Sequence, residues 1–291
     1  MGGTTSLVAA LVSLLEELDV DLRLDAPVSA IVVRQGRARS IRTESGERID
    51  CDIVVSNADP TQVYSRLIAP EHLSRHGPRS VARVRQSMSL FVAYFGATRQ
   101  YPEIAHHTIV MGSRYRDLLD DVFKRRVLAD DFSLYLHAPT RTDPSLAPPG
   151  HEGFYVLSPV PNNLSGIDWK RQREPYFARI VTELEARLLP GLGDALVSAS
   201  FMTPYDFEHT LRSADGCAFG PEPILTQSAY FRYHNRSPDV EGLYFVGAGT
   251  HPGGGVPGVL CSAKVLERVV PKPADGTPMP RRAVASAAVH A

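Results

Sequence analysis

The sequence predicts an α/β protein in which a parallel-sheet domain is interrupted by an α+β insert. Two short apolar runs, 52–56 and 243–247, are typical of strands in one parallel sheet, although nearly 190 residues separate them. The chain between them carries aromatic strands and intervening helices, a pattern that favours an antiparallel sheet backed by helices. Because two parallel strands cannot bury both faces of a sheet, we expect further strands to come from elsewhere.

The first elements are predicted to belong to the parallel-sheet domain. Leucines at helical spacing predict a helix over 4–18, and alternating apolar residues predict strands at 28–33 and 38–43. The run at 52–56 is apolar on both faces, so we expect both faces to be covered. A helix is predicted to follow at about 61–68.

The middle of the chain has a different character. Aromatic and β-branched residues predict three strands, at 89–96, 132–139 and 154–161. Helical patterns intervene at 113–123 and 172–189. These elements predict an insert with an antiparallel sheet and helices.

The resulting domain organisation is discontinuous. Residues 1–75 and 239–270 are predicted to form a partial domain around the parallel strands, and residues 76–238 to form the insert. The rest, 271–291, is rich in Pro, Ala and Arg without periodicity, which predicts a disordered tail.

Composition excludes several classes of function. The chain is 43% hydrophobic and 22% charged, as is ordinary for a globular protein, and its formal net charge of −1 gives no electrostatic reason to expect nucleic-acid binding. Three cysteines without C-x-x-C spacing argue against a thiolate metal site and favour a reducing cytoplasm. No run reaches the roughly 20 apolar residues of a transmembrane helix, and no signal peptide is recognisable.

The glycine-rich loop GAGTHPGGGVPG at 247–258 is the strongest candidate for a ligand site. It follows a predicted strand and precedes a helical pattern at 259–269, so backbone N–H groups and a helix N-terminus would point toward a bound group. It is not a dinucleotide fingerprint, because Pro252 stands where the third glycine should be. Both a ligand-contacting loop and a tight helix cap without a ligand fit this composition.

Histidines are weaker candidates. His106 and His107 could suggest a metal, but no third ligand has matching spacing, so we expect hydrogen-bonded or surface histidines and no metal site. His251, inside the glycine-rich loop, is the one titratable residue expected near a loop ligand. A chemical role and simple loop hydrogen bonding are both open for it.

Nine segments, in a fixed order and spacing, carry a resemblance to a known family. They are GGTTSLVAAL (2–11), SNAD (56–59), SLFVAYFG (89–96), AHHTIVMGSRYRDLLDDVF (105–123), DFSLYLHAPTRTDPSLAPPG (131–150), FYVLSPVP (154–161), PYDF (204–207), LTQSAYFRYHNR (225–236) and LYFVGAGTHPGGGVPGVLCSAK (243–264). With these segments the chain closely resembles the bacterial-type phytoene (carotenoid) desaturases, which are flavoproteins related to the amine oxidases.

The resemblance implies an FAD enzyme that dehydrogenates phytoene, a C40 hydrocarbon, toward lycopene. FAD would accept hydride, and the protein would position the substrate and exclude water. The parallel-sheet domain would then be a Rossmann-like FAD-binding domain, and the insert would bind substrate. The resemblance also implies a cytoplasmic protein associated peripherally with the inner face of the membrane, where such a substrate dissolves.

Site residues are carried over position by position. Val28 matches the residue whose backbone meets the adenine, and Asn57 and Ala58 match the strand end near the pyrophosphate and ribose. The loop and helix start beneath the ribityl chain and the flavin pyrimidine edge are matched by Gly249, Thr250, Gly255, Val256 and Pro257.

One departure from the family is large. The family begins with a βαβ unit carrying G-x-G-x-x-G, and this chain lacks it, so the FAD-binding domain is expected to be incomplete. A fragment, a mis-called start and one half of a split enzyme with a separate N-terminal half all fit. Alone, the chain is expected neither to hold FAD tightly nor to turn over. The alternatives are a desaturase or oxidase of another isoprenoid, and a non-catalytic lipid-binding remnant.

Overall fold

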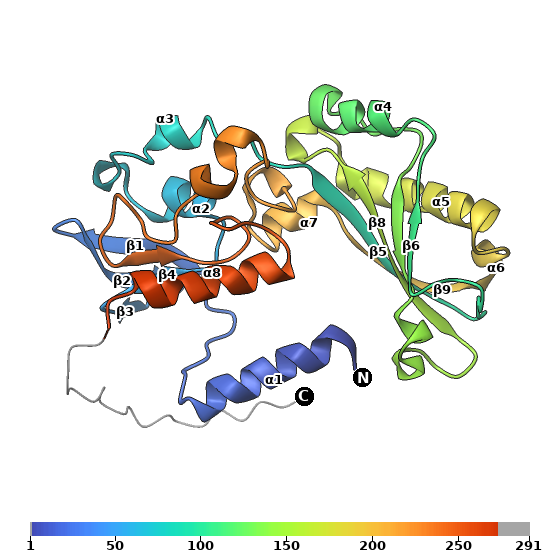
Figure 1. The fold of residues 1–291 in the computed structure, drawn as a ribbon, viewed down its shortest axis with the longest axis horizontal. Coiled ribbons are helices and arrows are strands. Elements are labelled where there is room, and N and C mark those ends of the chain that lie inside the picture. Colours follow the sequence, from blue (N-terminus) through green and yellow to red (C-terminus); the bar gives the residue numbers. More distant parts are fainter. Residues whose placement is uncertain (1, 273–291) are drawn as a thin grey trace.

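The computed structural model describes residues 2–272 and shows two lobes side by side (Figure 1). We call the lobe built from both ends of the chain the split lobe and the lobe between them the insert lobe. Each has its own buried hydrophobic core, one formed by segments within 31–81 and 233–245 and one by segments within 91–195. The exact domain boundaries stay a prediction, and the predicted disordered tail lies almost entirely outside the described residues.

The split lobe confirms the pairing predicted for the two distant apolar runs. Strand β4 (Val54–Ser56) and strand β10 (Leu243–Phe245) pair in parallel, with Leu243 opposite Val54. Beside them lies an antiparallel sheet of strand order β1-β2-β3. Its strands are β1 (Val28–Arg34), β2 (Arg37–Thr43) and β3 (Arg48–Asp50). The predicted strands at 28–33 and 38–43 are thus confirmed.

One expectation for this lobe is corrected. Val55 in β4 is 44% exposed, so the strand is not covered on both faces, because within residues 2–272 it belongs to a sheet of only two strands. The helix expected at about 61–68 is confirmed: α2 (Pro60–Gln62) continues directly as a π-helical segment that ends at Leu67. Further helices are α3 (Pro78–Val81) and α8 (Val256–Val269), the latter beginning three residues before its predicted start.

The insert lobe is an antiparallel five-stranded sheet with strand order β6-β7-β8-β5-β9, backed by helices as predicted. Its strands are β5 (Ser89–Ala97), β6 (His107–Val110), β7 (Leu134–His137), β8 (Glu152–Val160) and β9 (Leu196–Met202). Its helices are α4 (Tyr115–Asp120), α5 (Trp169–Arg187), α6 (Leu192–Ala195) and α7 (Pro204–His209). Strand β9 was not predicted.

Helix α5 covers one face of this sheet (Figure 1). Ile180 and Leu184 of α5 are completely buried and belong to the same core as Phe91 and Leu136 from the strands. Because side chains alternate along a strand, the apolar set faces α5 and the other set faces away from it. The second face of the sheet is therefore free for a different task.

Helix α1 (Gly3–Glu17) confirms the predicted helix. Only its first residues lie against the insert lobe, and within the described part of the chain none of its residues is buried (Figure 1). The large exposed residues of its apolar stripe are Leu7, Val8, Leu11 and Leu14. Within residues 2–272, no helix combines the length and the apolar character that crossing a membrane would require.

Candidate functional site

The glycine-rich loop follows β10 and lies beside the end of β4, because the carboxyl ends of two parallel strands lie at the same edge of the sheet. The Val246 N–H donates to the Ser56 carbonyl at 3.0 Å and extends the pairing by one residue. A Cβ at Gly247 would come within 2.1 Å of Asn57 Oδ1, and one at Gly249 within 2.4 Å of Pro60 Cδ. These two glycines are therefore required for the loop to pack against the end of β4.

The outer half of the loop is open. At Gly255, where φ is +90°, no described atom lies within 4 Å of the position that a Cβ would take. Gly255 is also the N-cap of α8, and no side chain among residues 2–272 caps that helix. The next residue, Val256, is 70% exposed. This uncapped and exposed helix start leaves backbone N–H donors available to an acceptor group.

This donor set fits the flavin that the sequence resemblance implies. A flavin ring presents carbonyl and ring-nitrogen acceptors along its pyrimidine edge, and backbone N–H groups at a helix N-terminus are suited to them. A glycine without neighbouring atoms lets a flat ring approach the backbone closely. The residues that could hold this edge are Gly254, Gly255, Val256 and Gly258.

The Arg232 side chain stabilises the glycine-rich loop by hydrogen bonds to its backbone, a role that the sequence analysis did not predict. Its guanidinium donates to the Ala248 carbonyl from Nε at 3.1 Å and from a terminal nitrogen at 2.7 Å. It also donates to the Pro221 and Phe219 carbonyls, at 3.0 and 2.8 Å. Burial lowers the pKa of Arg232, while the Asp59 carboxylate acts in the opposite direction. The alternation of charged and aromatic residues in FRYHNR was the available signal.

Thr250 lies within the glycine-rich loop and is completely buried. Its hydroxyl donates to the His251 carbonyl at 3.1 Å and accepts a hydrogen bond from Asn235 Nδ2 at 3.4 Å. Asn235 also donates to the Phe245 carbonyl, and Ser262 Oγ of α8 accepts from the Gly247 N–H. The Thr250 side chain thus stabilises the loop, and its predicted contact with a cofactor stays a prediction.

The remaining predicted site residues lie in different surroundings. Asn57 and Ala58 are exposed at the end of β4, beside the start of the loop, while Val28 begins β1 in the neighbouring sheet. Pro257 is exposed in the first turn of α8. Within the loop, His251 Nδ1 lies 3.1 Å from the Ala229 carbonyl, which accounts for its position by hydrogen bonding.

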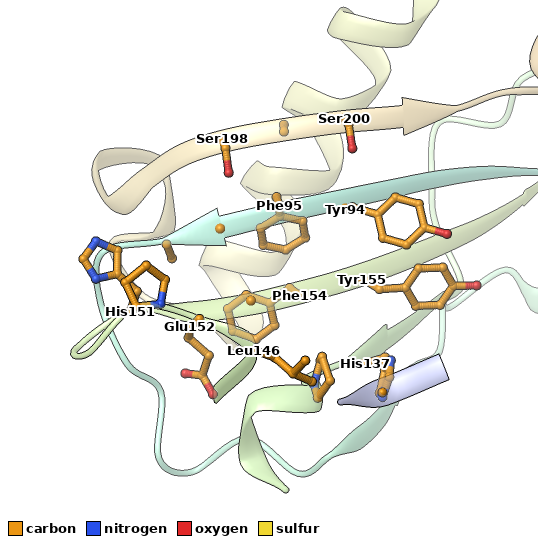
Figure 2. A pocket seen from close by; sticks show the side chains of 18 of the residues that line it. Tyr94, Phe95, His137, Leu146, His151, Glu152, Phe154, Tyr155, Ser198 and Ser200 are labelled. Atoms are coloured by element: carbon orange, nitrogen blue, oxygen red, sulfur yellow. The ribbon is translucent and has the colours of Figure 1, made fainter. Parts of the chain in front are cut away.

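A second concave region lies on the face of the insert sheet that α5 does not cover. It is a cavity of about 950 Å³ between that face and the first residues of α1. Figure 2 shows Tyr94 of β5 and Tyr155 of β8 side by side, with His137 nearby. The ring centroids of Tyr94 and Tyr155 are 5.3 Å apart. Burial, with Tyr94 and Tyr135 nearby, raises the pKa of Tyr155 to about 12. The cavity wall is therefore aromatic and uncharged at this point.

The structure also brings a third imidazole to His106 and His107. His137 ends β7 opposite His107 in the antiparallel register, and its Nε2 lies 2.7 Å from His106 Nε2. Sequence spacing could not reveal this neighbour, because it depends on the register between two strands about 30 residues apart. The histidines are hydrogen-bonded, as expected, but they form a three-residue cluster.

Comparisons with known proteins agree with the sequence resemblance. The profile of the family described as flavin containing amine oxidoreductase matches residues 1–264. The chain is 47% identical to a lycopene-forming phytoene desaturase of Pseudescherichia vulneris, over 90% of this chain and 54% of that protein. It is 40% identical to a neurosporene-forming phytoene desaturase of Rhodobacter capsulatus, over 93% and 53% respectively. The chain thus spans about half the length of the curated relatives it matches.

Solved structures show the same fold at low identity. An oxidoreductase from Methanosarcina mazei aligns with a TM-score of 0.60 and 18% identity, over 92% of this chain and 54% of that one. A putrescine oxidase bound to putrescine aligns with a TM-score of 0.53 and 14% identity, over 89% and 51%. The helices and sheets of this chain and of these neighbours agree with the predicted α/β class. The family match confirms the predicted flavin cofactor. The chain belongs to the flavin-containing amine oxidoreductase family.

Proposed function

We propose that this chain forms the flavin-edge and substrate-facing part of a phytoene desaturase. Such an enzyme uses FAD to convert single bonds of phytoene into conjugated double bonds on the way to lycopene. The observation that carries the proposal is the junction of β4 and β10, from which the open glycine loop leads into the uncapped start of α8. Its sequence support is the 47% identity to a lycopene-forming desaturase.

The chain's own residues would act on the flavin by position and electrostatics. When bound, FAD supplies the hydride acceptor. The N–H groups at the start of α8 would stabilise negative charge on the ring edge that they face, by about 0.3–1 kcal/mol or more when buried. Arg232 would act as a positioning residue, because its bonds to the Ala248 carbonyl fix the loop that approaches the ring.

The tyrosine-lined cavity is the part of the chain that suits a hydrocarbon. A hydrocarbon needs an apolar surface free of ordered water, and the rings of Tyr94 and Tyr155 present one. The volume of about 950 Å³ is that of a ligand cavity. The aliphatic residues of these strands pack against α5 instead.

The remaining parts of the proposal concern partners and location. The parallel sheet would be completed as a Rossmann-like FAD-binding domain by strands of an N-terminal half carrying the G-x-G-x-x-G unit. The exposed apolar stripe of α1 and the exposed start of α8 support such a docking surface. The assembled enzyme would act peripherally at the inner face of the membrane, where a C40 hydrocarbon dissolves.

The test is complementation in cells that accumulate phytoene. The chain would be co-expressed with the N-terminal half of a lycopene-forming relative, and pigments extracted and identified by their absorption. We expect coloured desaturation products with both halves and none with either half alone. Uncoloured extracts with two stable, associated halves would contradict the function.

Two glycine variants sharpen this test. Gly255→Ala and Gly36→Ala both place a Cβ at a positive φ where no described atom lies within 4 Å. Because the backbone at Gly255 (φ +90°, ψ +149°) is the more costly of the two for alanine, the urea midpoint of each variant is measured to separate loss of flavin from loss of stability. We expect Gly255→Ala to lose pigment and bound flavin, while Gly36→Ala keeps both. Equal behaviour of the two variants would contradict a flavin contact at Gly255. A yellow chain purified without any N-terminal half would contradict the expectation of weak FAD binding alone.

A further inference from the structure

The histidine cluster on the insert sheet combines three side chains from two strands. His107 begins β6, His137 ends β7 directly opposite it, and His106 precedes β6. Each offers one ring nitrogen, and these three nitrogens all lie within 4.8 Å of one another. Their ring centroids are 4.4 to 5.0 Å apart. Three imidazole nitrogens gathered this closely offer a ligand set for a transition-metal ion.

The outer ring nitrogens have oxygen partners. His107 Nδ1 lies 2.7 Å from the Tyr135 hydroxyl, and His106 Nδ1 is hydrogen-bonded to Thr142 Oγ1. Histidines that bind metals typically use their second nitrogen in this way, which fixes the ring and directs Nε2 inward. The cluster therefore has both a closely spaced inner set of nitrogens and outer hydrogen bonds to two of the rings.

The inner spacing requires two adjustments. His106 Nε2 and His137 Nε2 are 2.7 Å apart, which is a hydrogen-bond distance. A tetrahedral ion at about 2.0–2.1 Å from each nitrogen needs roughly 3.3 Å between them, so these two rings would have to separate by roughly 0.6 Å. The His107 ring stacks on the His137 ring with an interplanar angle of 14°, so it would have to rotate to turn a nitrogen toward the same ion. His107 is exposed, which leaves room for this rotation.

We propose that His106, His107 and His137 bind one divalent first-row transition ion of the zinc class at the rim of the cavity. Imidazole ligands without a carboxylate favour Zn²⁺, Ni²⁺ or Cu²⁺ over Mg²⁺ or Ca²⁺. His137 also lines the 950 Å³ cavity, and three protein ligands would leave a fourth coordination position open. The site joins β6 to β7 and does not depend on the proposed desaturase function.

The test is metal titration of the 291-residue chain without any affinity tag. Calorimetry with Zn²⁺ gives stoichiometry and affinity, and Co²⁺ gives a visible absorption spectrum that reports coordination. We expect one ion per chain and intense Co²⁺ bands typical of low coordination, which Zn²⁺ displaces. His137→Gln and His107→Gln should each weaken binding by more than tenfold, as loss of a direct ligand requires.

The matched control is His151→Gln. His151 lines the same cavity, but its Nδ1 faces the Pro149 carbonyl at 3.1 Å and it is outside the cluster. It should leave zinc affinity and the Co²⁺ spectrum unchanged. Tyr135→Phe keeps all three ligands and removes only the hydroxyl that contacts His107, so it should weaken zinc binding by about tenfold.

Two results would overturn the site. One is wild-type chain that binds no ion at a one-to-one ratio, or binds it as weakly as His137→Gln does. The other is equal loss of affinity in His151→Gln and His137→Gln. Far-ultraviolet circular dichroism checks that each variant is folded, and Tyr135→Phe provides the readout should a histidine variant fail to fold.

Discussion

The split lobe and the insert lobe differ in how completely they bury their apolar surface. In the insert lobe, α5 closes the core against a five-stranded sheet, and Ile180 and Leu184 have no exposed area. In the split lobe, the parallel sheet has two strands, and α8 carries Val256 and Leu260 at 70% and 65% exposure. The same chain therefore contains one self-sufficient core and one that is only partly covered.

This difference indicates where each lobe obtains its stability. The insert lobe is stabilised mainly by the burial of apolar side chains. The split lobe is also stabilised by hydrogen bonds between separate segments of the chain, notably those made by the side chains of Arg232 and Asp239. Contiguous exposed apolar area is typical of a surface that another protein covers. The split lobe is thus organised around a ligand and a partner surface, and the insert lobe around its own core.

The largest effect is expected in the core of the insert lobe. Phe91 of β5 is completely buried against Trp169 and Tyr176, with ring centroids 5.9 and 5.0 Å away. Phe91→Ala should lower the free energy of unfolding by about 3–5 kcal/mol. Urea denaturation followed by the fluorescence of Trp169, the single tryptophan, measures this.

The control for Phe91→Ala lies on the same strand with the opposite orientation. Tyr94 is 50% exposed on the open face, so Tyr94→Ala should cost about 1 kcal/mol or less. Similar urea midpoints for the two variants would mean that α5 does not close this core.

The next largest effect on stability should come from Arg232, which hydrogen-bonds the backbone of the glycine-rich loop. Arg232→Met removes every donor that satisfies the Ala248, Pro221 and Phe219 carbonyls, which should destabilise the split lobe by about 3 kcal/mol. Hydrogen exchange of the loop amides should rise with it. Arg236→Met is the control, because Arg236 is exposed in the same segment. A loop that exchanges equally slowly in both variants would refute the positioning role.

Asp239 should produce a smaller, pH-dependent effect. Burial acts to raise its pKa, but hydrogen bonds from the Arg75 N–H, His76 and Ser74 outweigh burial and lower the pKa to about 2. A depressed carboxyl pKa contributes stability that is present above the unfolded value near 4 and is lost as pH falls toward 2. Asp239→Asn should therefore cost about 2 kcal/mol at pH 7 and much less near pH 2.

Glu241→Gln is the matched control for Asp239→Asn. Glu241 pairs with Arg37 but its side chain is 60% exposed, so this variant should cost no more than about 0.5 kcal/mol. Thermal unfolding of both variants at pH 7 and near pH 2 separates the two cases. A constant difference between Asp239→Asn and wild type at both pH values would disprove the carboxylate account.

The sequence predicted those parts of the fold whose cause is local or periodic. The parallel pairing of 52–56 with 243–247, the hairpin of β1 and β2, and helix α5 all follow from apolar periodicity and are confirmed. Strand β9 was not predicted, although the alternation of Val197, Ala199 and Phe201 with Ser198 and Ser200 is a signal that could have indicated it. The exposure of Val55 and of the α1 leucines could not be predicted, since burial depends on neighbours and not on the residues themselves.

In the candidate site, too, the sequence predicted some features and could not predict those that depend on the folded chain. Glycine content located the loop at 247–258, but it could not show that Gly249 packs on Pro60 while Gly255 faces open space. The role of Arg232 depends on carbonyls at 219, 221 and 248, which only the folded chain brings together. His137 lies beside His106 and His107 because of the register between β6 and β7, which sequence spacing does not reveal.

The smallest effect on stability is expected on the exposed apolar faces. Leu11 in α1 and Leu260 in α8 are 52% and 65% exposed, so Leu11→Lys and Leu260→Lys should each change the free energy of unfolding by about 0.5 kcal/mol or less. Both variants should nevertheless abolish pigment in the complementation assay, because each puts a charge into the surface proposed to receive the N-terminal half. Destabilisation of the chain alone would mean that these leucines already pack within it. Unchanged pigment with neutral stability would mean that the exposed faces of the split lobe serve no partner, and the contrast between the lobes would then be one of packing alone.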